Sequence, residues 1–236
     1  MVADRRRLSV RSRVRRRALL ACALLLVACD SPTVNGEAPA YDAAFLDGAR
    51  RVIYHWPLGR TIAIYADATG APAGRDLRAA IEEGAAAWAA AVYYREFDIQ
   101  VVNDLAAADV TFHFELSPPP VNLDACPFAL LSSAAVTGGC LDNGLTRFLA
   151  IPFTSGAPGS RVKLDVTLST DPLKIPDAAV FRSVVAHELG HVLGIGQHSN
   201  DATDLMFAGP RAAGPSDRDA RTLRWVLHQP AQLRLE

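Results

Sequence analysis

The chain has 236 residues, of which 50% are hydrophobic and 21% are charged, and its formal net charge is −1. This is an ordinary globular composition. Residues 29–236 hold 16 basic and 24 acidic side chains. The resulting net charge of about −8 in that part argues against nucleic acid as a partner.

The N-terminal segment has the pattern of a secretory signal. Eight arginines lie among the first 17 residues, and an apolar run follows from Ala18 to Ala28. The run is too short for an ordinary transmembrane helix. Its end, Leu26-Val27-Ala28-Cys29, resembles a bacterial lipobox. We therefore predict a signal peptide over residues 1–28 and a lipid on the Cys29 sulfur, which would hold an exported protein at a membrane of the cell envelope. Cleavage nearby, with Cys29 incidental, is the alternative.

The remainder of the chain suits one domain behind a short linker. Residues 29–40 are rich in Ser, Pro, Asn and Gly and predict a flexible tether. Residues 41–236 are enough for one domain with a good core. Two cysteines, Cys126 and Cys140, fall within it. In an oxidising compartment an even pair favours one disulfide, and two free thiols are the alternative.

Strand and helix patterns alternate along this domain. Alternating apolar and β-branched residues predict strands over residues 61–65, 97–102, 109–114, 147–153 and 162–169. Apolar residues at helical spacing predict helices over residues 76–92, in the segment after residue 177, and over residues 216–227. Pro152 favours an edge position for the fourth strand, and Ser216 can cap the last helix. The pattern predicts an α+β fold.

The segment from His187 to His191 has the spacing of a zinc site. On a helix, His187 and His191 project from one face because they lie four residues apart. Two neutral imidazoles at this spacing can bind one Zn²⁺. Glu188 follows the first His and can act on a bound water as general base. A helix whose histidines face solvent or the core is the alternative.

A third ligand is expected shortly after this helix. Gly194 allows the chain to leave the helix sharply, and a bend there can bring His198 to the metal. Gln197 is the competing candidate, but imidazole is a far better zinc ligand than a neutral amide. Three protein ligands leave the fourth position open for water, as in catalytic zinc sites.

These residues resemble the motif of the metzincin metalloproteases, and within them the matrixins, the matrix-metalloproteinase type of catalytic domain. That motif is H-E-x-x-H-x-x-G-x-x-H followed by a methionine turn. The chain matches it at His187, Glu188, His191 and Gly194 and departs from it by one inserted residue before His198. Ser199 resembles the matrixin His-Ser pair, and Met206 matches the methionine of the turn.

The resemblance implies a metzincin-like α+β domain, with a twisted mixed sheet of about five strands and three helices. It also implies one catalytic Zn²⁺ with Met206 as an apolar floor beneath it. A peptide substrate would add to the sheet edge at residues 147–153, and residues 208–215 would shape a pocket for one of its side chains. Ile151 stands where a structural-zinc His would be expected, so we expect no structural zinc. No motif supports calcium, whose binding stays open.

The expected function is that of an exported, lipid-anchored zinc endopeptidase that works as a monomer, with protein or peptide as substrate and Glu188 as general base. Two alternatives remain. One is a non-catalytic peptide-binding lipoprotein on a metzincin scaffold, and the other is a zinc hydrolase of cell-wall peptides. Of the other histidines, His113 in the third predicted strand is the one to check for proximity to the metal.

Overall fold

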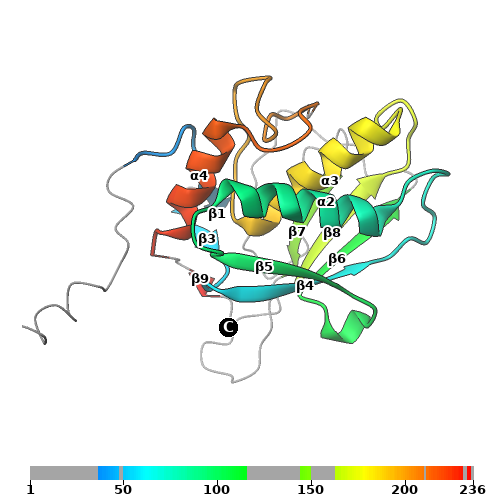
Figure 1. Ribbon diagram of the computed structural model, residues 1–236, viewed down its shortest axis with the longest axis horizontal. Coiled ribbons are helices and arrows are strands. Elements are labelled where there is room, and N and C mark those ends of the chain that lie inside the picture. Colours follow the sequence, from blue (N-terminus) through cyan, green and yellow to red (C-terminus); the bar gives the residue numbers. More distant parts are fainter. Residues whose placement is uncertain are drawn as a thin grey trace, which may run out of the picture. The chain divides into compact units, whose positions relative to one another are not determined.

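The computed structural model describes residues 37–47, 50–115, 144–149, 163–209, 211–230 and 233–234 (Figure 1). The predicted signal peptide, the lipidation at Cys29 and the disulfide between Cys126 and Cys140 lie outside the described residues. Contacts within the chain group Glu37–Glu236 into one unit. No helix among the described residues has both the length and the apolar character needed to cross a membrane.

The main sheet has five strands in the order β5-β4-β6-β8-β7. These strands are β4 (Arg60–Ala66), β5 (Phe97–Val102), β6 (Val110–Glu115), β7 (Gly144–Leu149) and β8 (Lys163–Ser169). Strands β5, β4, β6 and β8 are parallel to one another, and β7 pairs with β8 antiparallel. The expected mixed sheet of about five strands is therefore present, with β7 at one edge.

The predicted strands agree with this sheet except at β7. That strand begins at Gly144, three residues before its predicted start, and residues 150–153 lie outside the described part. Short elements that the sequence did not predict flank the sheet. β1 (Phe45–Asp47) pairs antiparallel with β2 (Arg50–Val52), and β3 (Tyr54–His55) pairs parallel with β9 (Leu233–Arg234). A one-turn 3₁₀ helix covers Leu105–Ala107.

Three α-helices lie in the described residues: α2 (Leu77–Ala91), α3 (Ala178–Leu193) and α4 (Asp217–Leu227). Each begins at a side-chain cap, which satisfies amide groups that the first turn leaves unpaired. Asp76 accepts from the Ala79 amide at 3.0 Å, and Asp177 accepts from the Val180 amide at 2.8 Å. The predicted first and last helices included the cap residues Asp76 and Ser216, so the observed helices begin one residue later.

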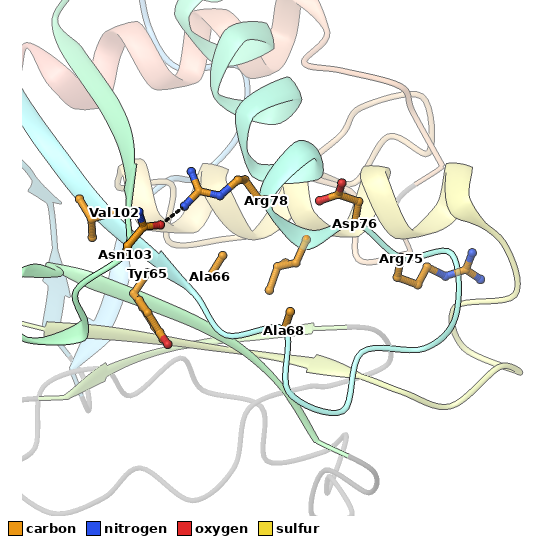
Figure 2. A pocket seen from close by; sticks show the side chains of 9 residues that line it. Tyr65, Ala66, Ala68, Arg75, Asp76, Arg78, Val102 and Asn103 are labelled. Atoms are coloured by element: carbon orange, nitrogen blue, oxygen red, sulfur yellow. Dashed lines mark hydrogen bonds between the residues drawn. The ribbon is translucent and has the colours of Figure 1, made fainter.

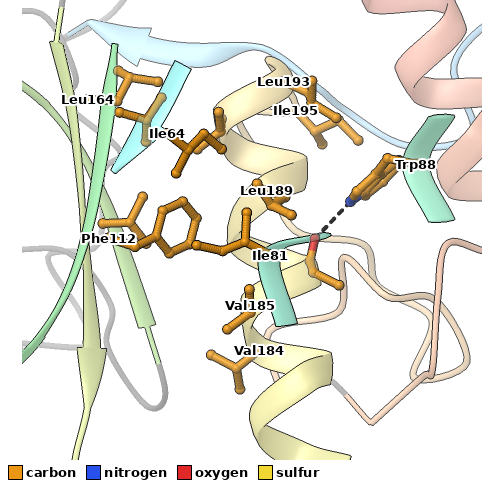
Figure 3. Close-up of a cluster of buried hydrophobic side chains, with 14 of the residues drawn as sticks. Ile64, Ile81, Trp88, Phe112, Leu164, Val184, Val185, Leu189, Leu193 and Ile195 are labelled. Carbon is orange, nitrogen blue, oxygen red and sulfur yellow. Dashed lines mark hydrogen bonds between the residues drawn. The ribbon is translucent and has the colours of Figure 1, made fainter. Parts of the chain in front are cut away.

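Helices α2 and α3 contact each other, and Figure 1 shows them side by side across one face of the sheet. Between them and the strands lies the hydrophobic core (Figure 3). Side chains from β4 and β6, such as Ile64 and Phe112, are fully buried there against α3 residues such as Val185 and Leu189. Burial of each such side chain stabilises the fold by about 1.5–3 kcal/mol.

Helix α3 is buried along nearly its whole length, from Val180 to Leu193, with Arg182 the exposed exception. Buried indole groups bond to its backbone. Trp88 Nε1 donates to the Ala186 carbonyl at 2.8 Å, and Trp56 Nε1 donates to the Val192 carbonyl at 2.8 Å (Figure 3 shows the first). The motif helix is therefore a fixed central element of the domain, from which side chains can be placed accurately.

Candidate metal centre

Three imidazoles meet at the C-terminal end of α3. His187 and His191 project from the helix, and His198 joins them from the turn that follows. One ring nitrogen from each lies within 4.8 Å of the others. The Nε2 atoms of His191 and His198 are 3.4 Å apart. Two ligands bound at 2.0–2.1 Å to one tetrahedral ion are separated by about 3.3–3.4 Å, so this pair already has the spacing of a shared metal.

Backbone carbonyl groups set the orientation of the two helix histidines. His187 Nδ1 lies 2.8 Å from the Leu205 oxygen, and His191 Nδ1 lies 2.6 Å from the Ile195 oxygen. A carbonyl oxygen can only accept, so each Nδ1 must carry the hydrogen, and each Nε2 of the neutral ring keeps its lone pair. Partners of this kind orient the histidine ligands of metal sites and raise their basicity. The donor set therefore fits a metal ion.

Burial keeps the three imidazoles neutral. His187 and His191 are each 3% exposed. Burial lowers the pKa of His187 to about 4 and the pKa of His198 to about 3. Burial, and then the neighbouring His187 and His198, hold the pKa of His191 well below its usual value. Neutral imidazole is the form that binds metals, so the site is ready to bind a cation near neutral pH.

The turn after α3 is made by Gly194, whose backbone is left-handed with φ 119°. Its amide donates to the His191 carbonyl, and the Ile195 amide donates to the Gly190 carbonyl at 3.0 Å. This is the Schellman pattern of helix C-termini, in which glycine is favoured. The same turn presents the Ile195 carbonyl to the His191 ring. One local structure thus ends the helix and orients a ligand.

The extra residue in the motif is accommodated by contacts with Ala43 and Ala44, just before β1. The Gly196 amide donates to the Ala43 carbonyl at 2.8 Å, and Gln197 Nε2 donates to the Ala44 carbonyl at 3.0 Å. The Gln197 amide nitrogen is therefore used in packing the turn against the segment before β1. His198 then follows with its ring 5.1 Å, centroid to centroid, from each of the other two imidazoles.

Met206 lies fully buried against the motif helix. A Cβ atom on Gly190 would collide with the Met206 sulfur and would come within 2.8 Å of Trp88 Cζ2. Gly190 lies between the two helix histidines in the sequence, so the thioether packs directly against the turn of helix that carries them. The expected apolar floor is consistent with this contact, although the sequence did not predict why position 190 must be small.

Two buried carboxylates, Asp204 and Asp219, support the turn that contains Met206, and both are 0% exposed. Asp219 accepts from the Leu205 amide at 2.7 Å and from the Tyr41 hydroxyl at 2.6 Å. Asp204 accepts from Ser199 and from Ser216. The sequence did not predict a role for either carboxylate in this turn. For Asp204, its position two residues before Met206 was the only available signal.

The remaining sequence candidates are not members of the imidazole group. His113, on β6, is not part of the imidazole group; its ring lies 3.2 Å from Asp165 and 3.3 Å from Glu115. Glu188 is 3% exposed within α3, directly after His187. Strand β7 forms the sheet edge that was expected to receive a peptide, and α3 contacts it.

Two cavities in the described part of the chain are lined by residues other than the imidazoles. One of about 500 Å³ lies at the carboxyl ends of β4 and β5, where Arg78 Nη2 donates to Asn103 at 2.6 Å (Figure 2). Another, of about 290 Å³, lies between α2 and α3 and includes Arg211 and Ala213 of the loop expected to shape a substrate pocket. None of the three imidazoles lines either cavity.

Comparison of the chain with protein-family models gave no match, and comparison with curated proteins gave none. What the structure establishes is an α+β fold in which His187, His191 and His198 lie together and could bind one metal ion.

Proposed function

We propose that the protein is an exported zinc endopeptidase of the metzincin type. The observation that carries the proposal is the convergence of three neutral imidazoles toward the end of a buried helix, in which the buried residue Glu188 directly follows the first of them in the sequence. Their Nε2 atoms would hold the ion, and a fourth position would remain for water. When bound, Zn²⁺ would lower the pKa of a water molecule and polarise the carbonyl of a substrate.

The protein's own groups would supply the proton transfers. Glu188 directly follows His187 in α3, and in this proposal its carboxylate accepts the proton of the attacking water and delivers it to the leaving amine. The rings of His187 and His191 stay fixed because the Leu205 and Ile195 carbonyls accept from their Nδ1 atoms. The reacting groups would then need no rearrangement during the reaction, which favours catalysis.

The edge strand β7 supports a peptide as the substrate. Only one side of β7 is paired within the described sheet, because β8 is its sole neighbour there. An extended peptide can pair with such an edge through backbone hydrogen bonds, which do not depend on its side chains. Contact between β7 and α3 brings this edge to the helix that carries His187 and His191.

Export and attachment to a membrane are part of the proposal. They rest on the arginine-rich and apolar pattern of residues 1–28 and on the lipobox-like Cys29. Labelling with a radioactive fatty acid in a bacterial host, for the wild type and for Cys29→Ala, tests this part separately. Incorporation of label that is lost in the variant supports it, and equal labelling of both contradicts it.

The enzymatic proposal is tested with the purified protein and a mixed peptide library, with and without a zinc chelator. Cleavage that the chelator abolishes and added zinc restores is expected. Binding of peptides without cleavage would favour a non-catalytic peptide-binding protein instead. Cleavage confined to cell-wall peptides would favour the hydrolase alternative.

A further inference from the structure

We propose that Asp204 is a positioning residue, which holds His198 in register with His187 and His191. This inference rests on the proposed function only in requiring that the three imidazoles bind a metal. Asp204 is fully buried, yet its carboxylate accepts hydrogen bonds from three side chains. The donors are Ser199 Oγ, Ser216 Oγ at 2.6 Å and Arg218 Nε at 2.9 Å.

The connection to His198 runs through Ser199, the next residue. The Ser199 hydroxyl donates to Asp204, and the Ser199 amide donates to the Met206 carbonyl at 2.8 Å. Ser199 and Phe207 also form an isolated parallel β-bridge. The residue after the third imidazole is thus fixed at both its backbone and its side chain by the turn of residues 204–207.

The same turn orients a second ligand. The Leu205 carbonyl, one residue after Asp204, accepts from His187 Nδ1 at 2.8 Å. A displacement of this turn would therefore move two of the three imidazoles relative to the one that the Ile195 carbonyl orients. Asp204 lies in this turn and accepts hydrogen bonds from Ser199, which follows His198, and from Ser216 and Arg218 at the start of α4. It therefore connects these three segments.

The donor arrangement matches a carboxylate at this position. Asp204 Oδ1 accepts from Ser216, and Asp204 Oδ2 accepts from both Ser199 and Arg218. An Asn side chain has one acceptor oxygen instead of two and carries no charge, so Ser199, Ser216 and Arg218 could no longer all donate to it. Burial alone would raise the pKa of Asp204, but the hydrogen bonds from Ser199, Ser216 and Arg218 keep that pKa below its usual value.

A purely structural role is the competing explanation, because Asp204 also contacts the cap of α4. Ser216 is the N-cap residue of that helix and forms a capping box with Asp219. Two variants separate the explanations. Ser199→Ala removes the contact on the His198 side, and Ser216→Ala removes the contact on the α4 side.

The test measures zinc affinity by chelator competition and the visible absorption of the Co²⁺-loaded protein, with far-UV circular dichroism as a check of folding. Loss of a group that orients a metal ligand lowers metal affinity by roughly 10–100-fold. We expect a loss of this size, with an altered Co²⁺ spectrum, for Asp204→Asn and for Ser199→Ala. The double variant should lose little more than either single one, because both changes break the same contact.

Ser216→Ala should lower the melting temperature while leaving the Co²⁺ spectrum unchanged. Asp201→Asn is the matched control, since Asp201 lies in the same loop and its side chain bonds only to Thr203 among the contacts described. Its backbone groups bond to Ser199 Oγ and to the Asp204 amide, and the substitution leaves them in place. Its zinc affinity should stay within about twofold of the wild type.

The inference is overturned if Asp204→Asn and Ser199→Ala both keep wild-type zinc affinity and spectrum, whatever their melting temperatures. That result would leave the proposed function intact, because the wild type would still bind zinc and cleave peptides. If the wild type binds no metal, both proposals are wrong. If Asp204→Asn fails to fold, Ser199→Ala alone decides.

Discussion

The side-chain amide of Gln197 donates to the carbonyl oxygen of Ala44 at 3.0 Å. The residue that is inserted relative to the metzincin spacing is therefore absorbed by packing against the segment before β1. The imidazole one position later, on His198, comes within 3.4 Å of His191 Nε2. An insertion that moves the third His by one residue is thus compatible with three converging imidazoles.

Replacement of these two residues should have different consequences. His198→Ala removes a donor, and its zinc affinity should fall by more than the roughly 10–100-fold that loss of a supporting group costs. Gln197→Ala should keep wild-type zinc content and lose about 1 kcal/mol of stability with its hydrogen bond. Zinc content after dialysis and melting temperature measure both effects. Zinc loss in Gln197→Ala with retention in His198→Ala would contradict the ligand assignment.

Glu188→Gln should keep the metal and lose the activity. The amide is nearly isosteric but cannot take a proton, and general acid–base catalysis contributes about 10²–10⁴-fold to rate. Glu82→Gln is a suitable control, because Glu82 is exposed on α2 and pairs only at the surface with Arg78. Its rate constant for peptide cleavage should match the wild type. Unchanged cleavage by Glu188→Gln at full zinc content would exclude the proposed base.

Gly190→Ala should destabilise the protein although alanine is the better helix former. The added Cβ would meet the Met206 sulfur and Trp88 Cζ2, and overpacking of this kind costs about 1–3 kcal/mol. Gly214→Ala is the matched control, because its Cβ would meet only Ala87 at 3.7 Å. Chemical denaturation of both variants measures the difference. A Gly190→Ala protein as stable as the wild type would show that Met206 does not pack tightly there.

The metal-free protein should lose stability on acidification. The unfolded histidines have a pKa of about 6.5, whereas burial lowers the pKa of His187 to about 4 and that of His198 to about 3 in the folded state. Below about pH 6.5 the unfolded chain binds more protons, so the stability, complete at neutral pH, falls as the pH drops toward 4. Each histidine contributes at most about 1.4 kcal/mol per pH unit.

Melting temperatures of the metal-free protein between pH 8 and pH 4 test this prediction. His198→Gln has one fewer titrating group and should show a shallower decline. A melting temperature that stays constant or rises as the pH falls would mean that the imidazoles are not buried as described.

Tyr41→Phe should weaken the support of the Met206 turn. The Tyr41 hydroxyl donates to Asp219, whose other oxygen accepts from the Leu205 amide. Loss of a hydrogen bond to a buried carboxylate costs about 1.5–3 kcal/mol. Tyr94→Phe is the control, because Tyr94 is 65% exposed. Equal denaturation midpoints for the two variants would show that the Tyr41 contact is not stabilising.

Local patterns in the sequence were sufficient for most of the main elements. Alternation placed β4, β5 and β6, and the apolar spacing of Leu77, Ile81 and Trp88 placed α2, because each pattern reports which face of an element is buried. The imidazole group followed from helix periodicity and one turn-forming glycine. His198 was predicted as the third member, in preference to Gln197, because imidazole is the better zinc ligand. The structure brings His198 to the other two imidazoles.

Other features depend on contacts between distant parts of the chain. β3 pairs with β9 over two residues only, which is too short a segment for any periodic pattern. Asp219 has the sequence position of a capping-box residue, and it fills that role. The same carboxylate also reaches the Leu205 amide, a contact that exists only once α4 packs beside the Met206 turn.

The central claim is that His187, His191 and His198 together bind one catalytic zinc ion. X-ray absorption spectroscopy of the purified, zinc-loaded protein tests it most directly, combined with the metal content per chain. We expect one zinc per chain with three imidazole nitrogens at about 2.0–2.1 Å and an oxygen ligand. A protein that retains no zinc, or a zinc shell with fewer than three imidazoles, would contradict the claim.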